Sequence, residues 1–174
     1  MSASPSHDVL LPVGTYRITP SHSSVSFTTR HFFGLGRVRG TASVAGGEIH
    51  IADPSERSSV TAQVAADSIT TGNGMRDLQV RSRMFLHARV HPVLTFESTA
   101  TIPTRDGWVI RGLLTAKGGT APVELTVLSV RTDEQRLVIE AEGRVDRYAH
   151  GVTLMKGMAA RHLDLHITVV AVPA

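Results

Sequence analysis

Alternation of apolar and polar residues is the clearest structural pattern in the chain. It extends over residues 22–30, 60–67, 94–102, 137–146 and 162–171. In the last of these segments, Leu163, Leu165 and Ile167 form an apolar face. Since successive side chains of a strand point to opposite faces, this pattern predicts antiparallel strands with one face in a core and the other in water.

Further segments fit strands between these runs. They are 14–19, 37–45, 47–51, 107–116 and 121–131. Pairs containing glycine or proline predict the turns: Gly46-Gly47, Asp53-Pro54, Asp106-Gly107 and Gly118-Gly119. Asp106-Gly107 is the strongest hairpin signal, because it separates two alternating runs.

Residues 73–86 break the alternation. Met75, Leu78, Ser82 and Phe85 recur there at a spacing of three to four, which predicts a short amphipathic helix. We therefore expect an all-β chain, with a flexible N-terminal segment over 1–13 and one domain over 14–174 of about eight strands and one helical insert. Closure into an extended antiparallel β-barrel would remove the exposed edges of a flat sheet, and a two-sheet sandwich is the alternative.

Many positions expected to face inward carry small side chains. They are Gly40, Ala42, Ala62, Ala66, Ser98, Ala100, Ala141 and Gly143. The interior of an eight-stranded barrel is either filled by its own side chains or holds one small ligand, and dry filling needs bulky residues. With 5% aromatic residues, the chain predicts either an apolar tunnel or strands that approach closely, with the helix plugging the gap.

Composition excludes several classes of function. A formal net charge of +3 is small for a dedicated nucleic-acid-binding protein. The lack of cysteine rules out a disulfide scaffold, a thiol nucleophile and a zinc–cysteine site. Residues 1–13 do not have the form of a secretory signal peptide, and no segment reaches the length of a membrane span, so we expect a cytoplasmic location.

Catalytic motifs are absent from the sequence. It contains neither a G-x-S-x-G nucleophile elbow nor a phosphate-binding loop, and no H-E-x-x-H zinc motif. His162 and His166 would lie about 13 Å apart on a strand, at ~3.3 Å per residue, which is too far for one ion. His87 and His91 lie near Pro92 in an apparent connection. We therefore predict no catalytic residue, no metal and no cofactor.

Six segments occur in the order and spacing of a known family. They are 16–27 (YRITPSHSSVSF), His31 with Val38-Arg39-Gly40, 67–73 (DSITTGN), 76–85, 91–98 (HPVLTFES) and 112–123 (GLLTAKGGTAPV). Together they resemble the YceI-like, polyisoprenoid-binding family, from Tyr16 to about Val172. Two segments depart from it: His91 replaces an aromatic residue before proline, and RYAHG at 147–151 replaces R-x-D-F-G.

The resemblance implies a lipocalin-like barrel whose elongated hydrophobic pore takes an isoprenoid chain, such as a polyprenyl phosphate or a quinone tail. It implies non-enzymatic binding, storage or transport of that lipid. The residues expected at the cavity and its mouth are Phe27, Phe32, Phe33, Leu35, Val38, Ile69, Met75, Leu78, Met84, Phe85, Phe96, Trp108, Leu114, Leu125, Ile139 and Leu165. His22, His31, Arg76, Arg81 and Arg83 are candidates for the head group, with a solvated helix face as the alternative for the arginines.

Two other functions stay open. The protein could be an enzyme or accessory factor for a hydrophobic substrate, with His22, His31 or His150 as acid or base. It could also be an interaction domain with a filled core, which predicts no pocket. The apolar stretch 32–36 suggests transient membrane contact. A homodimer is suggested by four valines expected to point outward, Val130, Val138, Val170 and Val172.

Overall fold

The computed structural model describes residues 11–31, 36–156 and 159–174, with only the backbone of His31. The strands in these ranges are β1 (Gly14–Ile18), β2 (Ser24–His31), β3 (Gly36–Ile51), β4 (Ser59–Ala65), β5 (Val93–Thr104), β6 (Gly107–Ala116), β7 (Gly119–Asp133), β8 (Arg136–Asp146) and β9 (His162–Pro173). The helices are α1 (Gly74–Arg81) and the short 3₁₀ helices η1 (Pro20–His22), η2 (Ser55–Arg57), η3 (Ala66–Ser68) and η4 (Arg147–His150). Residues 1–10 of the predicted flexible segment lie outside the described residues.

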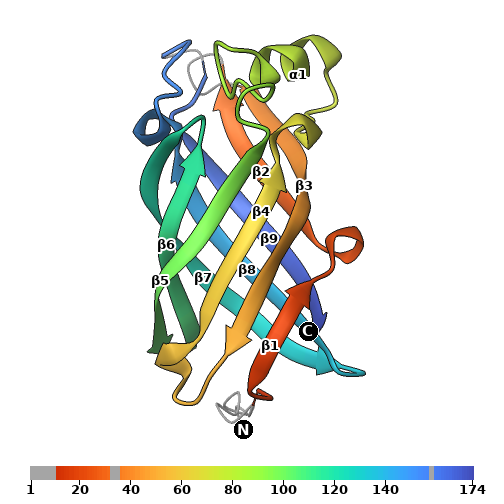
Figure 1. Cartoon of the computed structure of the whole chain (residues 1–174). Helices are drawn as coiled ribbons and strands as arrows, with labels where there is room; N and C mark the ends of the chain where they lie inside the picture. Colours follow the sequence, from red (N-terminus) through yellow and green to blue (C-terminus); the bar gives the residue numbers. More distant parts are fainter. Residues whose placement is uncertain (1–10, 32–35, 157–158) are drawn as a thin grey trace, which may run out of the picture.

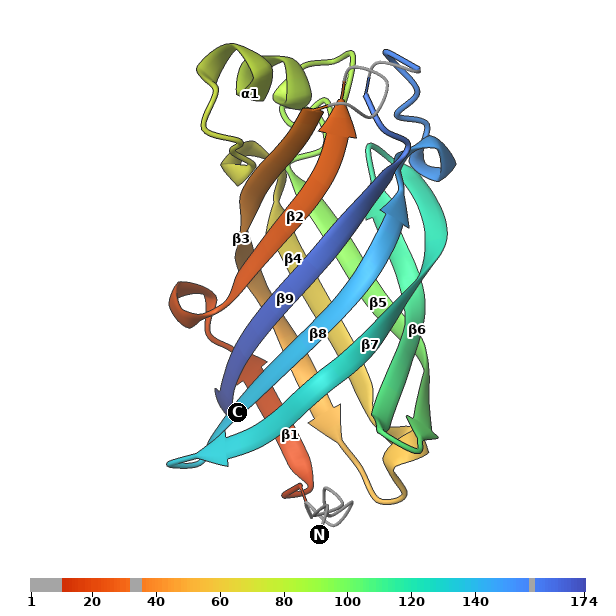
Figure 2. The same cartoon turned by 180° about the vertical axis from the view of Figure 1, so that it is seen from behind.

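The strands form one antiparallel sheet that closes on itself (Figures 1 and 2). Neighbours follow the order β1-β3-β2-β9-β8-β7-β6-β5-β4, and pairing of β3 with β4 completes the ring. β1 and β2 both pair with β3 and β9, but at different heights, so they share one position in the ring. The predicted antiparallel barrel of eight strands is confirmed, and the sandwich alternative is wrong.

The predicted turn at Gly46-Gly47 is wrong, because β3 runs through both residues. The register against β4 shifts between Val44 and Gly46, which marks a β-bulge. Gly47 has a φ of +149°, and the carbonyl oxygen of Thr61 occupies the space that a side chain there would need. A bulge bends a long strand, so two short predicted strands become one strand of 16 residues that curves around the barrel.

A second bulge, in β5, changes which residues face inward. The register against β6 shifts between Ser98 and Ala100. The inward face therefore continues with Thr101 and Pro103, which line the interior, in place of the predicted Ala100. One extra residue exchanges the two faces of a strand because the side-chain period is two.

A third bulge, in β7, corrects the predicted outward valines. The register shifts between Val127 and Ser129, and Val130 consequently lines the interior. Val138 is buried within the chain, with 8% of its surface exposed. Only Val170 and Val172 of the predicted set retain partial exposure on the wall, so the apolar surface expected for a homodimer is smaller than predicted.

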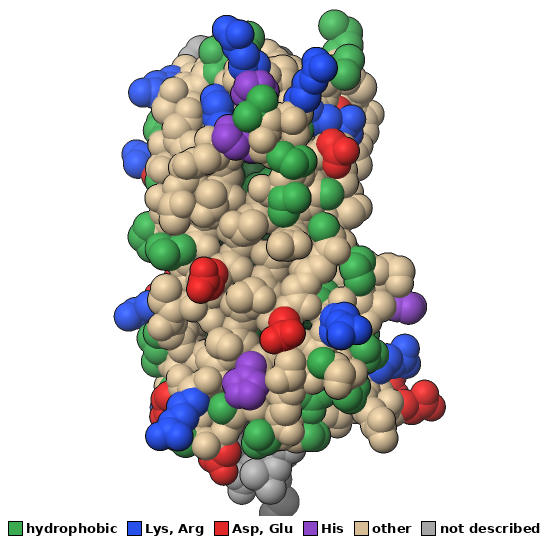
Figure 3. Space-filling view, in the orientation of Figure 1, with side chains coloured by type: hydrophobic (Ala, Val, Ile, Leu, Met, Phe, Trp, Pro, Cys, Tyr) green, Lys and Arg blue, Asp and Glu red, His purple; other side chains and the backbone are tan. Residues whose placement is uncertain are grey.

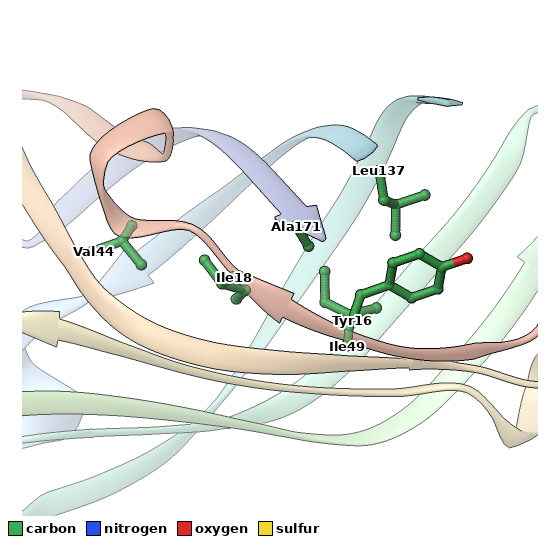
Figure 4. Packing of buried hydrophobic residues seen from close by; sticks show 6 residues of the cluster. All are labelled: Tyr16, Ile18, Val44, Ile49, Leu137 and Ala171. Atoms are coloured by element: carbon green, nitrogen blue, oxygen red, sulfur yellow. The ribbon is translucent and has the colours of Figure 1, made fainter. Parts of the chain in front are cut away.

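A packed hydrophobic cluster lies at the β1 end of the barrel (Figure 4). It comprises Tyr16, Ile18, Val44, Ile49, Leu137 and Ala171, from β1, β3, β8 and β9. The Tyr16 hydroxyl donates a hydrogen bond to the Pro12 carbonyl at 2.7 Å. This cluster fixes β1 in the ring and supports the wall of the barrel at that end.

Helix α1 lies at the opposite end of the barrel (Figure 1). Its N-terminus is capped by the Asn73 side chain, which accepts a hydrogen bond from the Arg76 N–H at 3.1 Å. The helix is shorter than the predicted 73–86, and its apolar face is not packed: Met75 is 85% exposed and Leu78 is 69% exposed. Within the described ranges, no helix is long and apolar enough to cross a membrane.

The orientation of α1 is set by a carboxylate instead of by its apolar residues. Asp77 is buried and accepts hydrogen bonds from Thr70 Oγ1 at 2.9 Å, Thr71 N at 2.8 Å and Thr71 Oγ1 at 2.6 Å. These bonds hold the Asp77 side of the helix against the preceding segment. Met75 and Leu78 are left exposed, which the helical spacing of apolar residues did not predict.

Candidate ligand-binding cavity

An apolar cavity of about 1310 Å³ occupies the interior of the barrel. Inward side chains of β2 to β9 line its length, η2 contributes Ser55 and Glu56 at one end, and α1 contributes Met75 and Gln79 at the other. Ligand pockets usually hold about 300–1,000 Å³, so this space is larger than a compact small molecule requires. The interior is therefore hollow, as the apolar-tunnel hypothesis predicts, and the alternative of a core filled by its own side chains is wrong.

Most of the predicted wall residues meet around this cavity. Those that line it are Phe27, Val38, Ile69, Met75, Phe85, Phe96, Trp108, Leu114, Leu125, Ile139 and Leu165. Leu78 and Met84 are exposed and do not line it. Phe32, Phe33 and Leu35 lie outside the described residues. That the lining residues bind a ligand stays a prediction.

The predicted head-group residues are dispersed. Arg76 lines the cavity, and its Nε donates to Thr71 Oγ1 at 2.8 Å. Arg81 donates from Nε and Nη2 to the Ile69 carbonyl, at 3.2 and 2.8 Å, and does not line the cavity. Arg83 is exposed and outside the lining, and His22 is exposed on η1. The side chain of His31 lies outside the described residues.

The small residues that face inward account for only part of the cavity volume. The ring of Phe27 lies where a side chain at Gly40 would be, and the ring of Phe96 covers Gly112 in the same way. Leu125 similarly occupies the space beside Gly143. Glycines thus accommodate large neighbouring side chains against the wall, an arrangement that differs from the close approach of strands considered as the alternative. The axis of the barrel stays open because these side chains lie along the wall.

Sequence reasoning missed Arg147 as a wall residue. It begins η4, lines the cavity and is 8% exposed. Its guanidinium lies over the rings of Tyr148 at 4.9 Å and Phe85 at 5.9 Å, measured to the ring centroids. Burial lowers the pKa of Arg147. The sequence feature that could have indicated this role is the position of the arginine immediately after the alternating run of β8.

Asp146, which precedes Arg147, is hydrogen-bonded to another arginine. Asp146 accepts two hydrogen bonds from Arg161, from Nε at 2.9 Å and from Nη2 at 2.7 Å. The hydrogen bond from Arg161 holds the pKa of Asp146 at about 2, below its ordinary 3.8. This pair joins the start of η4 to the residue before β9 and so closes the loop around Arg147.

Of the histidines in the enzyme hypothesis, His22 and His150 do not converge, and the side chain of His31 lies outside the described residues. His150 is buried in the cavity wall, but its two ring nitrogens lie 3.2 Å from the Asp146 carbonyl oxygen and 2.9 Å from the Leu114 carbonyl oxygen. His22 is on η1, which lies outside the barrel partway along its length, whereas η4 lies at the α1 end (Figures 1 and 2). Across the described part of the chain, no three His, Asp or Glu side chains are placed to hold a metal ion.

Comparison with known families decides the class of this barrel. The YceI-like domain matches residues 16–171. The chain belongs to the YceI-like domain family. Among its relatives, the UPF0312 protein of Serratia proteamaculans is 30% identical over 127 residues, covering 70% of this chain and 66% of that protein. Protein YceI of Salmonella newport is 32% identical over 115 residues, covering 63% of this chain and 60% of that protein. The chain thus spans about 60–66% of the length of these curated relatives.

Solved structures show the same YceI-like fold. BcnA of Burkholderia cenocepacia aligns with a TM-score of 0.76 at 19% identity, over 88% of this chain and 98% of BcnA. A polyisoprenoid-binding domain from Saccharophagus degradans, implicated in plant cell wall breakdown, aligns with a TM-score of 0.67 at 11% identity, over 94% and 100%. The Campylobacter jejuni YceI protein aligns with a TM-score of 0.59 at 18% identity, over 76% and 83%.

Proposed function

We propose that this YceI-like protein binds one long-chain isoprenoid lipid in its barrel and stores or carries it without chemical change. The observation that carries the proposal is the apolar cavity of about 1310 Å³, whose lining extends from η2 to α1. The polyisoprenoid-binding domain of Saccharophagus degradans, which has the same fold, supports the choice of ligand.

The energetics favour a long chain. Moving one carbon of the lipid tail from water into the cavity contributes about 0.8 kcal/mol to the binding free energy, so one five-carbon isoprene unit contributes roughly 4 kcal/mol. A few units therefore exceed the ~8 kcal/mol of micromolar binding even after several kcal/mol are lost on association. A flexible methionine in the wall, such as Met155, can adapt to a hydrocarbon of varying shape.

The α1 end is the end that meets a membrane containing the lipid. Hydrophobic side chains project there beside several Lys and Arg side chains (Figure 3). The exposed apolar residues include Met75, Leu78 and Met84, and the neighbouring exposed cations include Arg83 and Arg89. Apolar anchors flanked by cations match the surface of a bilayer with anionic lipids. Met75 and Gln79 of α1 line the cavity at the same end, so a lipid would pass directly between bilayer and barrel.

The intrinsic fluorescence of Trp108 tests the proposal. This residue is the chain's one tryptophan and lines the cavity. Titration with a polyprenol should change its emission with saturation at one lipid per protein. Ala141→Phe, which places a ring in the cavity, should weaken binding at least tenfold. Glu142→Phe, one residue along β8 and exposed, is the matched control and should bind like the wild type. Equal binding by both variants, or no saturable change in the wild type, would overturn the proposal.

A further inference from the structure

The acidic and basic side chains that line the cavity lie at opposite ends of the barrel. Acidic side chains occur among the described lining residues at Asp53 and Glu56, in and beside η2. The arginines of the lining are Arg30, Arg76 and Arg147, on the end of β2, on α1 and on η4. Figures 1 and 2 place these three elements together at the end opposite η2. The cavity is therefore positive at its α1 end and negative at its η2 end.

Arg147 is the most buried of these cations and has no carboxylate partner among the residues that the structure describes. Its Nε, Nη1 and Nη2 donate to the carbonyls of Ala160, Val152 and Ala159, at 2.8, 2.9 and 3.0 Å. None of the salt bridges within the described ranges includes it, and the adjacent Asp146 is bound to Arg161. A guanidinium has five N–H donors, so three carbonyls leave two for another acceptor.

A buried cation without an anion is costly, and buried charges are normally paired. The three carbonyls contribute partial negative charge, but they do not neutralise the guanidinium. An anionic group that enters the cavity at the α1 end would complete this pairing. Bidentate hydrogen bonding from arginine is the usual way to bind phosphate or carboxylate.

We propose that Arg147 binds the anionic head group of the lipid at the α1 end, which orients the chain with its tail toward η2. This inference rests on the proposed function and narrows it to isoprenoids with a phosphate-like head group. Arg76 contributes a second positive charge from α1. Asp53 and Glu56 repel the head group from the other end, so a ligand inserted in the reverse direction is disfavoured.

The test compares two lipids of equal chain length on the full-length protein. A polyprenyl phosphate should bind at least tenfold more tightly than the corresponding polyprenol, and rising salt should reduce that ratio. Equal affinity of the two lipids would overturn the inference and leave the proposed function intact. Binding of neither lipid would overturn the proposed function and this inference together.

Substitution then assigns the preference to one residue. Arg147→Met should lower the affinity for polyprenyl phosphate to that for polyprenol, so that the ratio of the two affinities falls to about one. Arg144→Met is the matched control, because Arg144 pairs with Asp164 on the exposed wall and should retain the full ratio. A full ratio in folded Arg147→Met would overturn the role of Arg147. If that variant does not fold, Arg147→Lys, which keeps the charge but loses the bidentate geometry, should reduce the ratio, and an unchanged ratio would overturn the role.

A free anion is a second source of the same chemistry. Inorganic phosphate at millimolar concentration should not displace the bound polyprenyl phosphate, because the tail supplies most of the binding energy. Displacement by inorganic phosphate, together with equal binding of the two lipids, would assign the site to a free anion and overturn the lipid assignment.

Discussion

Phe27 on β2 lies directly opposite Gly40 on β3, and its ring occupies the space that a side chain at residue 40 would need. The two residues together form one section of the cavity wall, since the ring can lie flat only where the neighbouring strand has no Cβ. Phe96 and Gly112 repeat the arrangement on β5 and β6. The glycines thus keep large rings against the wall and leave the axis of the barrel free.

Gly40→Ala should force the Phe27 ring into the cavity. We expect a loss of about 1–3 kcal/mol in the free energy of unfolding, which is typical of overpacking, and weaker binding of polyprenol. Urea unfolding and the Trp108 titration measure the two effects. Adding Phe27→Ala should relieve the clash, so the two substitutions should be strongly non-additive. Gly46→Ala on the same strand is the control, because no atom lies near its added methyl group. Equal destabilisation by both alanines would contradict this account.

Asp77→Ala should release α1 from the barrel. The substitution leaves the Thr71 N–H and the hydroxyls of Thr70 and Thr71 without their acceptor. We expect a lower Tm and faster amide hydrogen exchange over residues 70–81, with little change in the strands. Asp67→Ala, at an exposed aspartate of η3, serves as the control. Unchanged exchange over α1 in Asp77→Ala would contradict the role of the carboxylate.

The Asp146–Arg161 pair should make stability depend on acid pH. The folded-state pKa of Asp146 is about 2, against an ordinary 3.8, so its contribution is complete above about pH 4 and is lost as the pH falls toward 2. Asp146→Asn should therefore lower the Tm at pH 6 more than at pH 2.5. Asp164→Asn removes an exposed ion pair and should give a small change at both values. A Tm difference for Asp146→Asn that is the same at both pH values would rule out this coupling.

Exposed apolar residues of the α1 end that do not line the cavity should control membrane contact separately from lipid capacity. Leu78→Ser with Met84→Ser should reduce flotation with vesicles that contain phosphatidylglycerol, and slow transfer of a polyprenol from those vesicles to the protein. Leu128→Ser, at an exposed leucine of the barrel wall, should leave both unchanged. Equal flotation of the double variant and the wild type would show that the α1 end is not the contact surface.

The sequence pattern predicted the barrel because alternation follows directly from one face being apolar and the other wet. It could not predict the bulges in β3, β5 and β7, since one inserted residue leaves the composition unchanged and exchanges the faces. Thr101 therefore replaces Ala100 as an inward residue, and Val130 turns from the outer surface to the cavity.

The wall of the cavity was easier to predict than its ends. Phe27, Phe96 and Leu165 follow from strand period and the small inward residues, whereas contacts at the α1 end depend on loops. The packing of α1 is decided by the hydrogen bonds of Asp77, and Arg147 meets carbonyls from residues 152–160 that no local pattern connects to it. These contacts join residues that are 5 to 13 positions apart through irregular loops, to which neither the strand period nor the helix period applies.

Native mass spectrometry of the protein with a polyprenyl phosphate tests the central claim most directly. The account predicts a complex of one lipid per chain that survives dilution, and its loss in Ala141→Phe but not in Glu142→Phe. If only the mass of the bare chain is observed after incubation with polyprenyl phosphate, polyprenol and a prenylquinone, the hollow barrel does not serve to hold an isoprenoid.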